Sequence, residues 1–191
     1  MARRRDIPRS EIVDAAQALM ESRGCNGFSL RDLSAETGLR VASLQHHFPA
    51  KADLLTAIVS RACERFNTSM ALIEAETDGF AAQLERLRAL LLPETSGERL
   101  SALAVTAADW NTLTAATQEA ARQFTANILG WLGRFIQQAR AAGEISLDTD
   151  AESLAAGILA ALQGAMLLSR TLSPPQAALA AGFALSLPGK S

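Results

Sequence analysis

Apolar residues recur every three or four positions along most of the chain, which is the spacing of one face of an α-helix. No segment shows the strict alternation of apolar and polar residues, bounded by turn pairs, that predicts a β-hairpin. The pattern therefore predicts an all-α protein of about nine helices. Their expected positions are residues 8–23, 29–37, 41–47, 50–76, 80–92, 98–112, about 124–142, about 150–168 and 174–186.

The run SLRDLSAETGLRVASLQHHFPAK at residues 29–51 combines two short helices with a tight turn between them. Ser29 and Asp32 form a capping-box pattern at the start of the first helix, and Gly38 supplies the turn. The second helix, at 41–47, turns one leucine inward and leaves small or polar side chains outside. Two helices joined by a short glycine turn are typical of the helix-turn-helix unit, whose second helix enters the DNA major groove.

Residues 9–55 resemble the N-terminal domain of the TetR family of bacterial repressors. The matching pieces are the apolar positions of the first helix, Gly24, and the runs SLRDLSAETGL and LQHHFPAKADLL. The resemblance implies a three-helix helix-turn-helix DNA-binding domain at 1–49, followed at 50–191 by a helical effector-binding and dimerisation domain. Together with the outward-facing positions, it indicates that the DNA-contacting residues are Ser29, Arg40, Val41, Ala42, Ser43, Gln45, His46 and Lys51.

Three positions depart from the family's pattern. Gln45 stands where tyrosine is usual, Arg40 where serine or threonine opens the recognition helix, and Ala50 where serine precedes the lysine. Glutamine can pair with adenine, and arginine caps a helix poorly but binds phosphate or guanine. Lys51 opposes the helix dipole, at a cost of about 0.3–1 kcal/mol, which makes sense if a phosphate binds there. The alternative for Lys51 is an ordinary solvated lysine.

The charge of the chain is unevenly distributed. The net charge is −2, but residues 1–70 carry +2, with 10 Lys/Arg against 8 Asp/Glu, and residues 71–191 carry −4, with 8 against 12. Arginines cluster at the N-terminus, where they can contact phosphates or enter a minor groove. The cluster serves equally well as a solubilising tail. Its members are Arg3, Arg4, Arg5 and Arg9.

The helix expected at 150–168 carries a stripe of small residues, spaced by four, against which another helix can pack closely. Thr149 and Glu152 offer a capping box at its start. In the family, two C-terminal helices per subunit form a four-helix bundle between subunits. The resemblance thus implies a homodimer, although the stripe could instead pack within one subunit. The residues expected at the dimer interface are Phe124, Ile128, Ala156, Ala160 and Gly164.

Large aromatic residues beside isolated polar groups suit a small-molecule pocket, but they are equally ordinary in a helical core. The family fold places an effector pocket among the middle helices, beside the long helix at 50–76. On that basis the expected pocket residues are Phe66, Met70, Trp110 and Trp131.

No sequence motif indicates an enzyme. There is no glycine-rich phosphate loop, no nucleophile motif and no metal-spaced cluster, and no cofactor is expected. As in the family, we expect a ligand-responsive repressor that binds a palindromic double-stranded DNA operator as a homodimer and is released by a small-molecule effector. Two rival hypotheses are an all-helical carrier or enzyme with an apolar cavity, and a DNA binder without an effector.

The two cysteines, Cys25 and Cys63, do not make a disulfide framework, and no signal-peptide pattern precedes them. Cys63 falls on an apolar helix face, where cysteine commonly acts as a small hydrophobe rather than a sensor. The apolar run at 154–168 is interrupted by Gln163 and is shorter than the roughly 20 residues of a membrane span. We therefore expect a cytoplasmic protein without a membrane partner.

Overall fold

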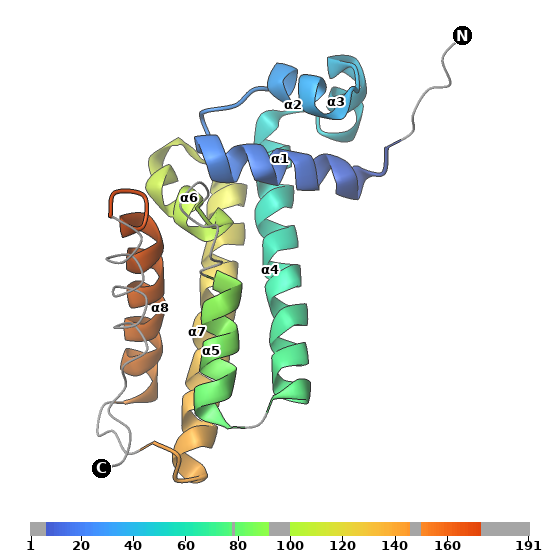
Figure 1. Ribbon diagram of the computed structural model, residues 1–191. Helices are drawn as coiled ribbons and strands as arrows, with labels where there is room; N and C mark the ends of the chain where they lie inside the picture. The colour runs from blue at the N-terminus through green and yellow to red at the C-terminus, as the bar shows by residue number, and fades with distance from the viewer. Residues whose placement is uncertain (1–6, 78, 92–99, 146–149, 173–191) are drawn as a thin grey trace. The chain divides into compact units, whose positions relative to one another are not determined.

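The computed structural model describes residues 7–77, 79–91, 100–145 and 150–172. Within these ranges the chain forms eight α-helices, one short 3-10 helix and no strand (Figure 1), which confirms the all-α prediction. The helix predicted at 174–186 lies outside the described residues. The elements are α1 (Arg9–Arg23), α2 (Leu30–Thr37), α3 (Val41–His47), α4 (Lys51–Glu76), α5 (Phe80–Leu91), α6 (Ala102–Ala108), η2 (Trp110–Thr112), α7 (Ala115–Ala141) and α8 (Ala151–Leu168).

The helix predicted at 98–112 is shorter than expected and is followed by a separate turn. Ser101 starts α6, because its hydroxyl accepts a hydrogen bond from the N–H of Ala104 at 3.2 Å. Asp109 leaves the helical conformation, and η2 follows it. At α8 the capping residue is Asp150 rather than Thr149, since its carboxylate accepts from the N–H groups of the second and third helical residues. The apolar pattern located these helices but not their caps.

The chain divides into two compact units, which the two longest helices both enter. Unit 1 comprises Met1–Ala62 and Arg99–Phe124, and unit 2 comprises Cys63–Glu98 and Thr125–Ser191. Each unit therefore contains part of α4 and part of α7. The functional boundary expected after residue 49 stays a prediction.

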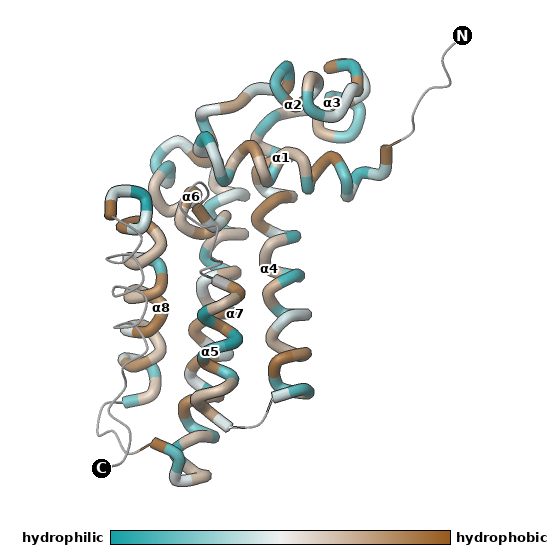
Figure 2. Tube along the Cα trace, in the orientation of Figure 1, coloured by the Kyte–Doolittle hydropathy of each residue, from teal (hydrophilic) through white to brown (hydrophobic). Residues whose placement is uncertain are grey.

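Unit 1 is built on a core shared by α1, α2, α3 and the first turns of α4. Figure 2 shows the apolar positions that recur along these helices. An ion pair at the edge of the core joins α4 to α1, with Arg61 donating to both oxygens of Asp14 at 2.8 and 3.0 Å. The side chains that fill the core include Ile12, Ala16, Met20, Leu33, Leu44, Phe48, Leu54 and Ile58.

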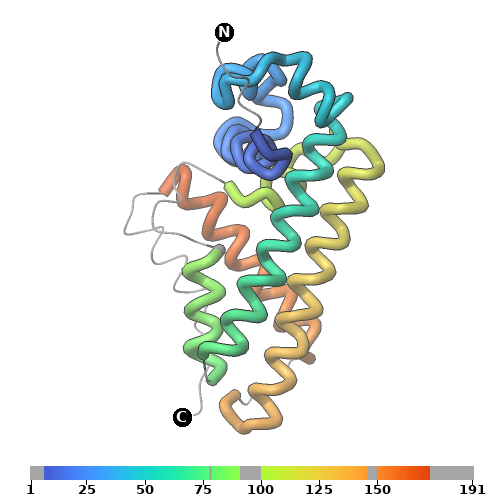
Figure 3. The backbone as a smooth tube through the Cα atoms, turned by 90° about the vertical axis from the view of Figure 1, so that its right-hand side faces the viewer, coloured from blue at the N-terminus to red at the C-terminus, as the bar shows by residue number. Residues whose placement is uncertain are grey.

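Unit 2 is built on a series of aromatic contacts between α4, α5 and α7. Phe80 stacks on Phe135 with 4.7 Å between ring centroids, and Phe135 stacks on Trp131 at 5.0 Å. Trp131 also meets Phe66 edge to face at 6.5 Å. In this unit the later turns of α4 run beside α7 (Figures 1 and 3). The indole N–H of Trp131 donates to Glu74 at 2.6 Å, so the one polar atom of the ring has a partner.

Candidate nucleic-acid interface

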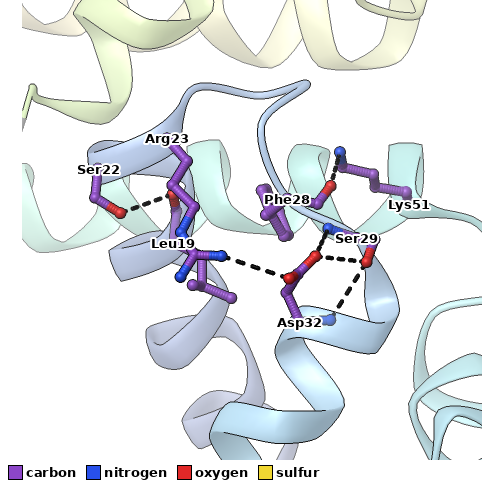
Figure 4. A network of polar contacts seen from close by, with 7 residues as sticks. All are labelled: Leu19, Ser22, Arg23, Phe28, Ser29, Asp32 and Lys51. Carbon is purple, nitrogen blue, oxygen red and sulfur yellow. Dashed lines mark hydrogen bonds and ion pairs between the residues drawn. The ribbon is translucent and has the colours of Figure 1, made fainter.

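The start of α2 is fixed by a reciprocal capping box, as the sequence predicts (Figure 4). The N–H of Ser29 donates to the Asp32 carboxylate at 2.7 Å, and the N–H of Asp32 donates to the Ser29 hydroxyl at 3.3 Å. The hydroxyl of Ser29 also donates to that carboxylate. Hydrogen bonds from the Ser29 hydroxyl and then its backbone lower the pKa of the Asp32 carboxyl. The cap therefore favours a charged carboxylate at the positive end of α2.

The turn between α2 and α3 is held by hydrogen bonds from residues on both sides of Gly38. Gly38 lies at φ +71° and ψ 5°, the left-handed conformation that favours glycine, and its N–H donates to the carbonyl of Ser34 at 2.9 Å. The hydroxyl of Ser34 donates to the carbonyl of Leu39, and the N–H of Leu39 donates to the Thr37 hydroxyl at 3.3 Å. These contacts set the orientation of α3 against α2.

The short helix α3 presents one exposed face and buries a single leucine. Leu44 is fully buried. Ala42, Gln45 and His46 are exposed, and because they are three and four residues apart they share one side of the helix. Arg40 is exposed at the N-cap position and makes no side-chain cap hydrogen bond there.

The remaining residues expected to contact DNA also belong to unit 1. Ser29 is exposed at the start of α2, whereas Val41 and Ser43 are half-buried in α3. The structure thus brings the predicted DNA-contacting residues of α2, α3 and α4 together in one unit.

Lys51, the first residue of α4, is half-buried and contacts Phe28 (Figure 4). Its ammonium group donates to the carbonyl of Phe28 and lies 4.4 Å from the centroid of the Phe28 ring. Burial lowers the pKa of Lys51, and the nearby carboxylates of Asp109 and Asp32 act in the opposite direction. An ammonium has three N–H donors, so a phosphate contact would use those that Phe28 does not take.

A second cation lies over an aromatic ring in the same unit. The Arg9 guanidinium, at the start of α1, stands 4.5 Å from the centroid of the Phe48 ring, which follows α3. The sequence suggested Arg9 as part of a basic arm but gave no sign of this partner. The other members of that arm lie outside the described residues. No local pattern could have shown the Arg9–Phe48 contact, because the two residues are far apart in the chain.

The residues expected to line an effector pocket fall into both units. Phe66, Met70 and Trp131 are buried in unit 2, and the rings of Phe66 and Trp131 are in contact. Trp110 belongs to unit 1, where its half-buried ring lies 5.0 Å from the guanidinium of Arg122. The structure thus brings three of the four residues into one unit and leaves Trp110 in the other.

The residues expected at the dimer interface differ in their exposure. Phe124 and Ile128 are 6% and 1% exposed, so they pack within the single chain. On α8, Ala156 and Ala160 are exposed and Gly164 is half-buried. A Cβ atom added to Gly164 would meet no atom of the described residues within 4 Å. Of these five residues, those on α8 have the surface that a second subunit would need.

The described residues show no cluster suited to a metal ion and one long apolar helix. Among the described residues, no group of three or more His, Cys, Asp or Glu side chains could hold a metal ion. By length and composition alone α8 could cross a membrane, with 18 residues and a mean hydropathy of 1.5. Length therefore does not exclude a span, contrary to the sequence argument. The core helix of a soluble protein meets the same criteria, and seven residues of α8 are buried.

The protein resembles solved structures over nearly its whole length. It aligns with a transcriptional regulator of the TetR family from Agrobacterium tumefaciens at 26% identity, with 93% of this chain and 95% of that one covered and a TM-score of 0.82. A TetR transcriptional regulator from Legionella pneumophila aligns at 22% identity, with coverages of 95% and 97% and a TM-score of 0.81. Regulatory protein TetR from Rhodobacter sphaeroides aligns at 16% identity, with coverages of 92% and 96% and a TM-score of 0.83. The last two establish the fold alone.

Family models match both parts of the sequence. The model described as bacterial regulatory proteins of the tetR family matches residues 12–58, which contain the capping box, the turn and α3. The model described as the tetracyclin repressor-like C-terminal domain matches residues 102–184. No curated protein sequence matches the chain. With the helix-turn-helix geometry and both family models in agreement, the chain belongs to the TetR family of bacterial transcriptional regulators.

Proposed function

We propose that this regulator is a repressor that binds a palindromic DNA operator as a homodimer and is released by a small-molecule effector. The observation that carries the proposal is the exposed face of α3. It presents Ala42, Gln45 and His46 on one side, while Leu44 fixes the opposite side in the core. A short helix with small and polar side chains outward is the shape that enters a major groove.

In this proposal the side chains of the interface divide into two roles. Gln45 reads a base edge, since its amide can bond adenine through both of its polar atoms. Arg40 binds a phosphate or a guanine at the start of α3, and the N–H groups at the start of α2 receive a phosphate beside Ser29. Lys51 adds a phosphate contact with the donors that Phe28 leaves available.

The dimer is supported by the exposed small residues of α8. Two half-sites in successive major grooves lie about 34–36 Å apart, so reading them requires two recognition helices. The exposed stripe of Ala156 and Ala160, continued by Gly164, suits close packing against the same stripe of a second copy. In this arrangement Phe124 and Ile128 support the interface from within each chain rather than touching the partner.

An apolar effector would act through unit 2. Phe66 and Met70 lie one turn apart on α4, and Phe66 touches Trp131 of α7. An effector bound among these residues would tilt α4, which continues into unit 1, and so change the separation of the two recognition helices. It can do so only by binding the non-operator conformation more tightly than the operator-bound one. We further infer that the regulator acts in the cytoplasm and catalyses no reaction.

The test is a selection of genomic DNA fragments by the purified protein, followed by footprinting of the most enriched fragment at defined salt. A protected near-palindrome supports the proposal, and a Gln45→Ala variant should then lose or shift preference at one position of each half-site by about 1–3 kcal/mol. A matched Arg40→Ala variant should weaken binding to all sequences if Arg40 holds a phosphate. Enrichment no greater than the salt-sensitive background contradicts operator binding.

A further inference from the structure

The loop between α1 and α2 is held by side chains that come from two distant parts of the chain. Just after α6, the Asp109 carboxylate accepts a hydrogen bond from the N–H of Cys25 at 2.7 Å. At the other end of the loop, Lys51 donates to the carbonyl of Phe28. The side-chain amide of Asn26 donates to the Thr112 hydroxyl of η2 at 2.9 Å, between these two points. All of these residues belong to unit 1.

Two glycines allow the backbone of the loop to take the shape that this attachment needs. Gly24 has φ +86°, and a Cβ atom there would stand 3.3 Å from the carboxylate oxygen of Asp109. A Cβ atom on Gly27 would stand 1.9 Å from the carbonyl oxygen of Arg23, so only glycine fits. Between them Cys25 is fully buried. The backbone is thus shaped so that the Cys25 N–H points at a carboxylate.

Asp109 is itself held in place by the chain around it. Its N–H donates to the carbonyl of Val105 at 3.0 Å, completing the last turn of α6. Its own carbonyl accepts from the N–H and the hydroxyl of Thr112, at 2.9 and 2.8 Å. The carboxylate therefore projects from a fixed backbone, and its contact with Cys25 transmits the position of the α6–η2 corner to the loop.

The charges at the two ends of the loop are opposite. Asp109 brings a carboxylate and Lys51 an ammonium group, and the Asp109 carboxylate acts to raise the pKa of Lys51 against the effect of burial. The thiol of Cys25 adds no charge, since burial, reinforced by Asp109, raises its pKa to about 12. The loop is therefore held by a charged acceptor at one end and a charged donor at the other, which are the stronger kinds of hydrogen bond.

We propose that Asp109 is a positioning residue for DNA binding. Through the Cys25 amide it fixes the α1–α2 loop. That loop in turn fixes the start of α2 and the Phe28 carbonyl to which Lys51 donates. Ser29, the cap of α2, directly follows Phe28, so a displaced loop would displace the capping box and with it α2 and α3. Asp109 does this without touching DNA. The functional consequence rests on the operator binding proposed above. The hydrogen bond from the Cys25 N–H to the Asp109 carboxylate, called the clamp below, does not depend on it.

The clamp can be tested in the free protein by hydrogen exchange of the Cys25 amide. Replacing Asp109 with alanine removes the acceptor, so exchange of the Cys25 amide should speed up by about tenfold or more. Asp109→Asn keeps an oxygen of similar position without the charge and should show a smaller increase. Unchanged exchange in Asp109→Ala overturns the clamp, whatever the DNA measurements show.

The functional part is tested by the affinity for the footprinted operator across a series of salt concentrations. Asp109→Ala should weaken binding by about tenfold, and Asp109→Asn should recover part of the loss. The slope of affinity against salt should become shallower in Asp109→Ala, because the displaced loop carries the start of α2 and the carbonyl that holds Lys51, and both α2 and Lys51 are proposed to contact phosphates. An unchanged slope would mean that the phosphate contacts survive the loss of Asp109, and it would overturn the positioning role.

A matched control is Glu119→Ala in the same unit, which removes an exposed carboxylate paired with Arg122 at 3.3 Å. This variant should bind the operator as the unmodified protein does. Unchanged operator affinity in Asp109→Ala would overturn the proposal. If Asp109→Ala fails to fold, Asp109→Asn carries both readouts, and unchanged exchange and affinity in that variant would overturn it. Failure of the unmodified protein to enrich any operator would instead contradict the proposed function.

Discussion

The contacts inside unit 1 differ in kind from the contacts inside unit 2. In unit 1, polar side chains bond to specific backbone groups, as Asp109 does to Cys25 and Lys51 to Phe28. In unit 2, a series of stacked aromatic rings joins α5 and α7, as in the stack of Phe80 on Phe135, and hydrogen bonds such as that from Trp131 to Glu74 lie beside it. Hydrogen bonds are directional and fix an orientation, whereas apolar contacts depend mainly on the area buried. The first kind suits a DNA-binding surface, and the second suits the effector-binding role that we propose for unit 2.

The largest expected effect comes from breaking the aromatic stack of unit 2. Phe135 lies between Phe80 and Trp131 and is buried, so Phe135→Ala should lower the free energy of unfolding by about 3–5 kcal/mol. Urea unfolding followed by circular dichroism measures this. The control is Leu72→Ala, also in unit 2, whose side chain is 53% exposed and whose loss should cost no more than about 0.5 kcal/mol. Equal losses in the two variants would show that the stack does not stabilise the unit.

A smaller effect is expected when the exposed stripe of α8 is filled. A Cβ atom on Gly164 meets no atom of the described residues within 4 Å, so Gly164→Leu tests whether a second copy packs against this position. Overpacking of about 1–3 kcal/mol per chain should weaken the proposed dimer, which sedimentation over a range of protein concentrations would detect. Gly133→Leu on α7, where a Cβ atom also meets nothing within 4 Å, serves as the control. An intact dimer in Gly164→Leu would place the stripe away from the interface.

A smaller loss of stability is expected when the cap of α2 in unit 1 is removed. Ser29→Ala deletes the hydroxyl that bonds Asp32 and should cost about 1 kcal/mol, whereas Ser29→Gly should cost only a few tenths. The same hydroxyl lowers the pKa of Asp32, so this pKa should rise in Ser29→Ala when followed by NMR. Because the pKa of Asp32 is lower in the folded protein, the cap stabilises the protein at pH values above the unfolded-state pKa of Asp32. This stabilisation is lost as the pH falls through the folded-state pKa. A Ser29→Ala protein with the same acid sensitivity as its parent would contradict this.

A last effect, confined to alkaline pH, is a loss of stability through Cys25. Its thiol pKa is raised from 9.0 to about 12, so the protonated form is favoured in the folded protein. Stability should therefore be retained below pH 9 and fall as the pH rises from about 9 towards 12. Melting temperatures at pH 8 and pH 10 should differ less in Cys25→Ala than in the unmodified protein. A difference of the same size in both proteins would assign the alkaline loss to other groups.

The parts of the structure that the sequence predicted are those made by near neighbours in the chain. Ser29 and Asp32 are three residues apart, and Gly38 acts on its own turn, so the pattern of residue types was enough to predict both. The bounds of α3 were correct for the same reason. Helical spacing also predicted that Leu44, the one leucine of α3, is buried.

The contacts that the sequence did not predict join residues that are distant in the chain. Asp109 and Cys25 are 84 positions apart, and no periodicity or motif relates them. Lys51 was expected in the first turn of the long helix and begins α4, but its contact with Phe28 depends on how two segments fold together. Trp110 shows the same limit: an aromatic residue predicts burial, but not the unit in which it is buried.

The two tryptophans give each unit its own spectroscopic reporter. The chain has no tyrosine and two tryptophans, Trp110 in unit 1 and Trp131 in unit 2. Trp131 is buried against two phenylalanines, whereas Trp110 is half-buried under a guanidinium, so their emission spectra should differ. Replacing either one with phenylalanine leaves a protein whose intrinsic fluorescence reports on a single unit. The light emitted by this protein can therefore show whether an added compound disturbs one half of the molecule before the other.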